Sequence, residues 1–242
     1  MLIAATHICG CSIEGSDGTV GKVKDLLFDG ATWNVRYLDV DTGGWLPGRR
    51  VILSPEVIRA SEYAARWLAT PLTKKQVEDS PSFYSNLPVS RQTEIELARY
   101  YSWGAYWADA VLAADEAQRE GDPDLRSTEA VSGYDIRATD GEIGHVEDFI
   151  VDDEPPQHGA WEIRYLVIDT RNWLPGRHVL VPPLWAESIE WDQQRVEIGL
   201  TREMIENGPE YNPGDAVNRR YEEVLYDYYG RPKYWSGTEH AV

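Results

Sequence analysis

The sequence is poor in cysteine and has no long apolar run. Cys9 and Cys11 are its only cysteines, which are too few for a disulfide framework, and a single CxC motif cannot complete a structural zinc site. No apolar stretch approaches the roughly 20 residues that span a bilayer. Residues 1–11 also lack the basic start and cleavage site of a signal peptide. The sequence therefore predicts a cytoplasmic protein without an integral membrane segment.

Basic residues are scarce as well. The 242 residues include 23 Lys and Arg against 41 Asp and Glu, which gives a formal net charge of −18, and most of this excess lies after residue 121. Nucleic-acid binding depends on basic groups that displace counterions from phosphate, so no nucleic-acid partner is expected. Anionic membrane surfaces are disfavoured for the same reason. The acidity is typical of a surface that keeps a protein dispersed in water.

Motifs of the common enzyme classes are missing. The sequence contains no nucleophile elbow, phosphate loop, dinucleotide glycine fingerprint or paired-histidine metal motif. Its five histidines are scattered, and no two of them lie four residues apart. The acidic run Asp152-Asp153-Glu154 is typical of a solvated loop. We therefore expect no enzyme, no cofactor and no metal site.

What the sequence does contain is an internal repeat. Trp33 to Pro55 aligns without gaps on Trp161 to Pro183, and 13 of these 23 positions are identical. The match extends upstream, across a connection that is longer in the second copy, to the turn pairs Asp17-Gly18 and Asp140-Gly141. Downstream it continues in the same register to the aromatic pairs Tyr106-Trp107 and Tyr234-Trp235. Such self-similarity indicates a duplicated module. We expect modules at 1–121 and 122–242, joined at the turn-rich stretch that begins with Gly121.

Each repeat predicts strands first and helices afterwards. Apolar and polar residues alternate along 35–40 and 163–168, as they do in strands with one buried face. Further short strands are expected at 51–53 and 179–181, and the Gly and Pro turns between them favour a small closed or nearly closed barrel. Helices are expected at 74–79, 91–101, 202–207 and 219–229. The predicted fold class is mainly β with short helices.

The motifs resemble those of a known family. An Asp-Gly turn, a Gly-x-Val strand, an aromatic strand and the Trp-Leu-Pro-Gly-Arg loop resemble the PRC-barrel family, over about Ile3 to Pro81 and again over Val131 to Pro209. The resemblance implies two small PRC-type β-barrels in tandem, each followed by a helical or aromatic segment. Similar barrels form the cytoplasmic part of the photosynthetic reaction-centre H subunit and many small stand-alone bacterial proteins. Neither case implies catalysis by the barrel.

The candidate structural or interaction residues fall into two groups. The first group lies in the repeated loop and comprises Trp45, Trp173, Arg49 and Arg177. We expect these tryptophans to lie in the core and these arginines to pair with Asp41 and Asp169. The second group is Tyr106, Trp107, Tyr234 and Trp235. These side chains are expected to pack on the other barrel, as in a homodimer fused by duplication, or else to mediate dimerisation or bind a partner.

Three function classes remain open. The leading hypothesis is a non-enzymatic interaction or adaptor protein whose two modules bind a protein partner. The first alternative is an accessory protein near an electron-transfer complex, similar to the reaction-centre H subunit. The second alternative is a ligand-binding protein or hydrolase of an unrecognised type. The sequence identifies neither the process nor the partner.

Overall fold

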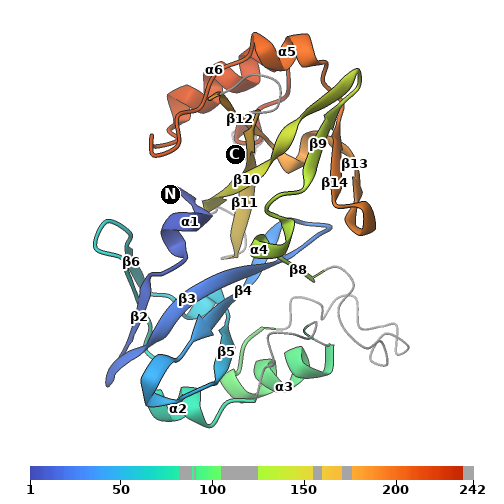
Figure 1. The fold of residues 1–242 in the computed structure, drawn as a ribbon. Coiled ribbons are helices and arrows are strands. Elements are labelled where there is room, and N and C mark those ends of the chain that lie inside the picture. The colour runs from blue at the N-terminus through green and yellow to red at the C-terminus, as the bar shows by residue number, and fades with distance from the viewer. Residues whose placement is uncertain (82–88, 90, 105–124, 155–159, 171–175, 237–242) are drawn as a thin grey trace, which may run out of the picture. The chain divides into compact units, whose positions relative to one another are not determined.

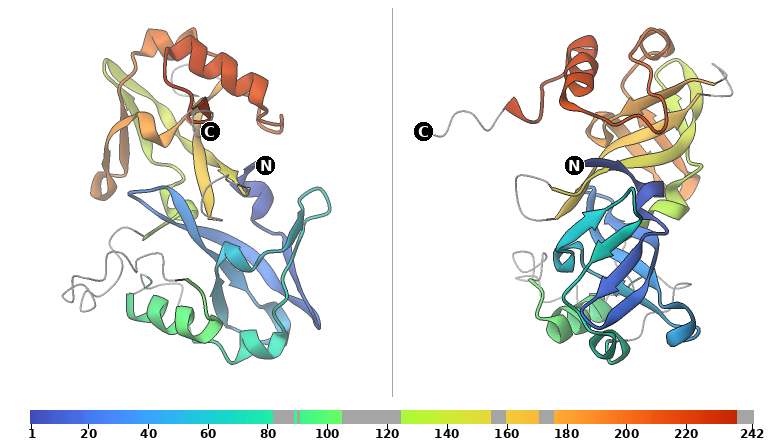
Figure 2. Two further views of the ribbon diagram at one scale, coloured as in Figure 1. Left: turned by 180° about the vertical axis from the view of Figure 1, so that it is seen from behind. Right: turned by 90° about the vertical axis from the view of Figure 1, so that its left-hand side faces the viewer.

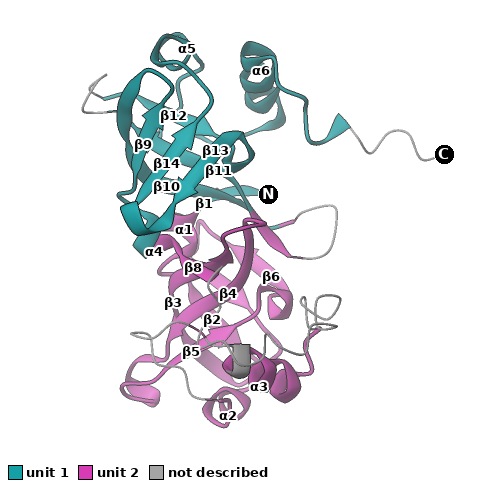
Figure 3. Ribbon diagram, turned by 90° about the vertical axis from the view of Figure 1, so that its right-hand side faces the viewer, with its two compact units in different colours: residues 1–4, 130–153, 163–242 teal, residues 5–129, 154–162 magenta. Residues whose placement is uncertain are grey.

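The computed structural model describes residues 1–81, 89, 91–104, 125–154, 160–170 and 176–236. The chain divides into two compact units (Figure 3). Unit 2 comprises residues 5–129 and 154–162, and therefore most of the first repeat. Unit 1 comprises residues 1–4, 130–153 and 163–242, and therefore most of the second repeat.

Unit 2 contains a mostly antiparallel sheet (Figure 1). Its strands follow the order β5-β4-β3-β2-β7-β6, and only β2 and β7 run parallel. Gly18 opens the long strand β3 with a φ of +125°, a conformation that glycine adopts without steric cost. The strands are β2 (Ser12–Gly15), β3 (Gly18–Asp29), β4 (Asn34–Asp41), β5 (Arg50–Leu53), β6 (Ala60–Glu62) and β7 (Trp67–Ala69).

Unit 1 has the same sheet order, β12-β11-β10-β9-β14-β13, and here β14 and β9 run parallel. The first two residues of β11 belong to unit 2, where they pair with β4. The side chains of β11 alternate in burial and then become fully buried toward its end. The strands are β9 (Asp135–Ala138), β10 (Gly141–Asp152), β11 (Trp161–Asp169), β12 (His178–Val181), β13 (Ala186–Glu190) and β14 (Arg195–Ile198).

Helices follow the strands in both units, as the sequence predicts. Thr73 and Thr201 cap the short helices α2 (Lys74–Glu78) and α5 (Arg202–Glu206), since each side chain accepts a hydrogen bond from a backbone N–H of the first turn. The longer helices are α3 (Arg91–Tyr101) and α6 (Arg219–Tyr229). α3 lies beside α2, and α6 lies beside α5 (Figure 2). In each pair a tyrosine of the longer helix donates its hydroxyl to a backbone carbonyl of the shorter one, Tyr100 to Gln76 and Tyr228 to Met204.

Shorter helical elements complete the fold. The α-helical turns are α1 (Ala5–Ile8) and α4 (Thr128–Val131). The 3₁₀ turns are η1 (Gly43–Trp45), η2 (Pro55–Val57), η4 (Pro183–Trp185) and η5 (Trp191–Gln193). η2 and η4 occupy equivalent positions in the two repeats, directly after β5 and β12.

The first strand of each repeat belongs to the unit formed mainly by the other repeat. β1 (Leu2–Ala4) pairs with β10, with Ile3 opposite Val151. β8 (Leu125–Ser127) pairs with β3, with Arg126 opposite Phe28. The two registers are equivalent under the sequence repeat. The repeats therefore exchange their N-terminal strands reciprocally.

The exchanged strands are also held by carboxylates. In unit 2, the buried Asp25 accepts hydrogen bonds from the Thr128 hydroxyl at 2.6 Å and from the backbone N–H of Glu129 at 3.0 Å. In unit 1, the N-terminal ammonium of Met1 lies 2.6 Å from a carboxylate oxygen of Asp153 and 3.3 Å from one of Asp152. Hydrogen bonds with an ionised partner are stronger than neutral ones, so these contacts stabilise both strand pairings.

The mainly β fold with short helices is confirmed, but neither sheet closes into a barrel. Among the described residues, no pairing joins β5 to β6 or β12 to β13. Pro55 and Pro183 open the 3₁₀ turns after β5 and β12, and proline has no N–H to offer to a ladder. β6 is exposed at all three residues. The predicted module boundary at Gly121-Asp122 lies outside the described residues and stays a prediction.

Deleting Leu2–Ala4 should loosen one half of β10. Amides of Phe149–Asp152 should exchange with deuterium at least about tenfold faster, because their edge loses the β1 ladder. Amides of Gly141–His145, whose half of the same strand pairs with β9, serve as the internal control. Unchanged exchange at Phe149–Asp152 would show that β1 does not cover this edge.

Candidate functional site

A buried carboxylate organises the C-terminal aromatic segment of unit 1. Glu222 of α6 is only 1% exposed. Its Oε1 accepts hydrogen bonds from the hydroxyls of Tyr165 on β11, at 2.7 Å, and Tyr234, at 2.8 Å. Its Oε2 lies 2.9 Å from a guanidinium nitrogen of Arg219. The site thus joins the sheet, the long helix and the segment after it.

The two phenols act as hydrogen-bond donors to Glu222. Burial and the neighbouring negative charge of Glu222 raise the pKa of Tyr165 well above its ordinary value. Burial and the hydrogen bond to Glu222 likewise raise the pKa of Tyr234. Both hydroxyls therefore keep their protons at neutral pH. A carboxylate with these donors and one guanidinium is well satisfied in the interior.

Arginines and aromatic rings hold Tyr234 and Trp235 in place. The guanidinium carbon of Arg164 lies 4.3 Å from the centre of the Tyr234 ring, and that of Arg219 lies 4.1 Å from the centre of the Trp235 ring. The Trp235 ring also meets the Tyr226 ring edge-on at 5.1 Å. These contacts all lie within unit 1, and the expected packing of this segment on the other module stays a prediction. Cation–π contacts of this kind stabilise a ring next to its own arginines.

The equivalent site in unit 2 has the same buried glutamate and the same tyrosine donor. Glu94 of α3 is fully buried, and its Oε1 accepts a hydrogen bond of 2.8 Å from the Tyr37 hydroxyl of β4. Tyr101 stacks on Trp103 with ring centres 4.4 Å apart. The predicted candidates Tyr106 and Trp107 lie outside the described residues. The Tyr–Glu pair is therefore common to both repeats.

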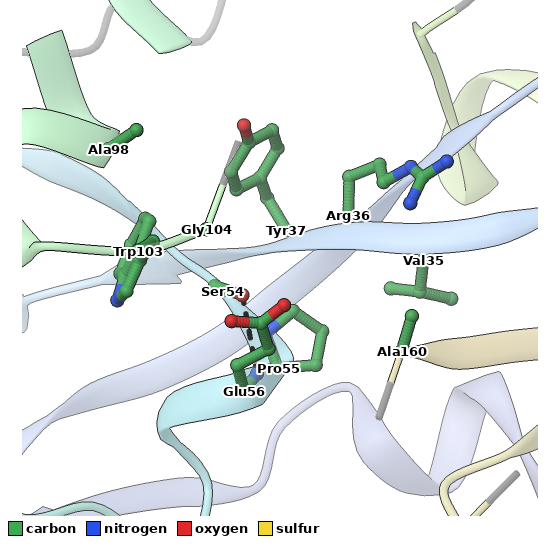
Figure 4. Close-up of a pocket in the computed structure, with 10 residues that line it drawn as sticks. All are labelled: Val35, Arg36, Tyr37, Ser54, Pro55, Glu56, Ala98, Trp103, Gly104 and Ala160. Atoms are coloured by element: carbon green, nitrogen blue, oxygen red, sulfur yellow. Dashed lines mark hydrogen bonds between the residues drawn. The ribbon is translucent and has the colours of Figure 1, made fainter. Parts of the chain in front are cut away.

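A small pocket opens beside Tyr37 in unit 2 (Figure 4). Trp103 lies on one side of it, Val35 and Ala160 on another, and Ser54–Glu56 along a third. Its volume is about 30 Å³, which is room for a few water molecules but far less than the several hundred Å³ of a typical cofactor site.

The loop tryptophan is less buried than predicted. Trp45 is half-buried and does not belong to the core. Its indole N–H donates to the backbone carbonyl of Val20 at 2.7 Å, and the Lys74 ammonium lies 5.6 Å from its ring centre. The ring is partly exposed, and the Lys74 ammonium lies over it. Trp173, the equivalent residue, lies outside the described residues.

The loop arginines bind helix ends rather than aspartates. Arg49 donates to the backbone carbonyls of Glu78 and Ser80, at the end of α2. Arg177 donates to the carbonyl of Gly208, just after α5. The last carbonyls of a helix lack intrahelical partners and carry partial negative charge, which attracts a guanidinium. The predicted pairing of these arginines with Asp41 and Asp169 is therefore replaced by helix capping.

A comparison with known families identifies the strand-rich part of the first repeat. The family model described as PRC-barrel domain matches residues 2–68. The chain thus contains a PRC-barrel domain. No curated protein matches the chain. Among the described residues, no helix of the PRC-barrel domain or of the rest of the chain is long and apolar enough to cross a membrane.

Sequence reasoning missed the buried carboxylates. Glu94 follows the residues that match the PRC-barrel domain. Its counterpart Glu222 is 128 residues further on, the same offset that relates Tyr37 to Tyr165. A glutamate on a charged helix is normally exposed, so the residue type alone does not predict that Glu94 and Glu222 are buried. Their recurrence at equivalent positions, together with a recurring tyrosine, was the available signal.

Replacing Glu222 by Ala should lower the free energy of unfolding by about 3 kcal/mol, because it leaves Arg219, the buried Tyr165 phenol and the half-buried Tyr234 phenol without their acceptor. The measurement is urea unfolding followed by tryptophan fluorescence. Glu223→Ala is the matched control, since Glu223 is the exposed neighbour on the same helix, and it should change stability by less than about 0.5 kcal/mol. Equal effects of the two changes would contradict the assigned role of Glu222.

Proposed function

We propose that the protein is a non-enzymatic docking protein built from two PRC-barrel modules, the second being residues 122–242. The support for a second module is that contacts of the first recur at equivalent positions. The recurring contacts are Tyr37–Glu94 and Tyr165–Glu222, Arg49–Ser80 and Arg177–Gly208, Tyr100–Gln76 and Tyr228–Met204, and Lys74–Asp17 and Arg202–Asp140. We expect a cytoplasmic protein that binds another protein and no nucleic acid.

The observation that carries the docking role is the pocket beside Tyr37. Two aromatic rings, Tyr37 and Trp103, lie next to an arginine and a glutamate, Arg36 and Glu56. Such a lining offers apolar contact in the centre and opposite charges at the rim, which is the composition of protein interfaces. The expected occupant is one apolar side chain of a partner protein, flanked by charged residues.

The two modules differ at this position. Ala98 lines the pocket, whereas the equivalent residue Tyr226 fills the corresponding space with a ring in contact with Trp185 and Trp235. The second module thus carries bulky aromatic side chains where the first is open. We infer that the first module docks the partner and that the second contributes a rigid, filled counterpart. A homodimer would use the same open pocket for a second copy of the chain.

The test is to fill the pocket with the residue of the second module. Ala98→Tyr should leave the fold intact but reduce recovery of the protein partner at least about tenfold in affinity capture from the native cell, because the partner side chain is displaced. Arg99→Tyr adds the same bulk at the next, exposed position of α3, and should capture as the unchanged protein does. Capture that survives Ala98→Tyr in full would overturn the docking role of this pocket.

A further inference from the structure

Three side chains with metal-binding atoms meet on one face of unit 1. They are Glu147 of β10, Asp169 of β11 and His178 of β12, and one ligand atom from each lies within 4.8 Å of the other two. His178 Nε2 is 2.8 Å from a carboxylate oxygen of Glu147. Asp169 and His178 are directly opposed on neighbouring antiparallel strands. Three adjacent strands thus supply one residue each.

The backbone around these residues is closely constrained. The backbone N–H of Tyr211 donates to the carbonyl of His178 at 2.9 Å. A Cβ added to Gly144 would lie 1.9 Å from the carbonyl oxygen of Asp169, so only glycine allows β10 to approach β11 this closely. Asp169 is 1% exposed, whereas the Glu147 side chain is 40% exposed. The group is therefore anchored in the sheet and open to solvent on one side.

The first repeat has different chemistry at the same positions. Its equivalents are Lys24, Asp41 and Arg50. Two cationic side chains thus accompany the aspartate in the first repeat, whereas a glutamate and a histidine accompany it in the second. In the first repeat the guanidinium of Arg50 pairs with Asp39. The second repeat instead places two carboxylates and an imidazole together, which is a set of metal-binding donor atoms.

We propose that Glu147, Asp169 and His178 bind one divalent transition-metal ion of the Zn²⁺ type. Imidazole with carboxylates suits such ions, whereas Mg²⁺ and Ca²⁺ prefer oxygen ligands alone. Bonds of about 2.0–2.1 Å in a tetrahedron place ligand atoms roughly 3.4 Å apart. The half-exposed Glu147 side chain can swing inward to reach this spacing. Three protein ligands leave a fourth position for water or for a donor atom of a bound molecule.

The test is titration of the full chain with Zn²⁺ in a calorimeter. One ion should bind per chain, and it should raise the melting temperature of the protein. Glu147→Lys and His178→Arg each install the residue of the first repeat, so they preserve a side chain that the fold accepts there. Each should weaken Zn²⁺ binding by about 100-fold or more, since loss even of a residue that only supports a ligand costs 10- to 100-fold.

Two controls separate this site from other Zn²⁺ ligands. His7→Gln removes an exposed histidine of unit 2 and should bind as the unchanged chain does. Co²⁺ in place of Zn²⁺ reports ligand type, and its spectrum should lack the thiolate band that binding at Cys9 or Cys11 would produce. No saturable binding, binding unaffected by both substitutions, or a thiolate band would each overturn the proposal.

Discussion

Each long strand has more edge than its own repeat can cover, and the rest of the structure depends on how that edge is paired. β3 has 12 residues, but β2 covers only Gly18 to Lys22 along one side of it. β10 has the same length and the same shortfall beyond β9. Unpaired backbone groups in a buried strand are costly. The exchanged strands β8 and β1 pair with the remainder, which makes each compact unit a product of both repeats.

This shared frame explains how the two repeats can carry different sites. The Tyr–Glu pair and the arginine that caps the helix end recur in both repeats. In each unit these contacts therefore attach the helices to the sheet at equivalent positions. Substitutions on that frame then alter the surface. Ala98 stands where the second repeat has a tyrosine and lines a pocket in one unit. His178 stands where the first repeat has an arginine and belongs to the proposed metal site in the other.

Much of the fold was predictable from the sequence, because strands, turns and capped helices leave local patterns. Thr73 and Thr201 mark helix starts that the structure confirms. The strand exchange was not predictable, since alternation along a strand does not say which copy supplies its partner. The site was predicted only in part. Arg49 donates to a carbonyl 31 residues further along the chain, and Glu222 accepts a hydrogen bond from a tyrosine 57 residues earlier. Contacts between residues so far apart leave no local pattern in the sequence.

The most direct test of the strand exchange is to cut the chain between the repeats. A protease site inserted within residues 105–124 would be cleaved under native conditions, and the product examined by size-exclusion chromatography and native mass spectrometry. Because each unit includes a strand from the other repeat, the two fragments should remain together at about the 27.5 kDa of the intact chain. Separation into two folded fragments without denaturant would contradict the exchange.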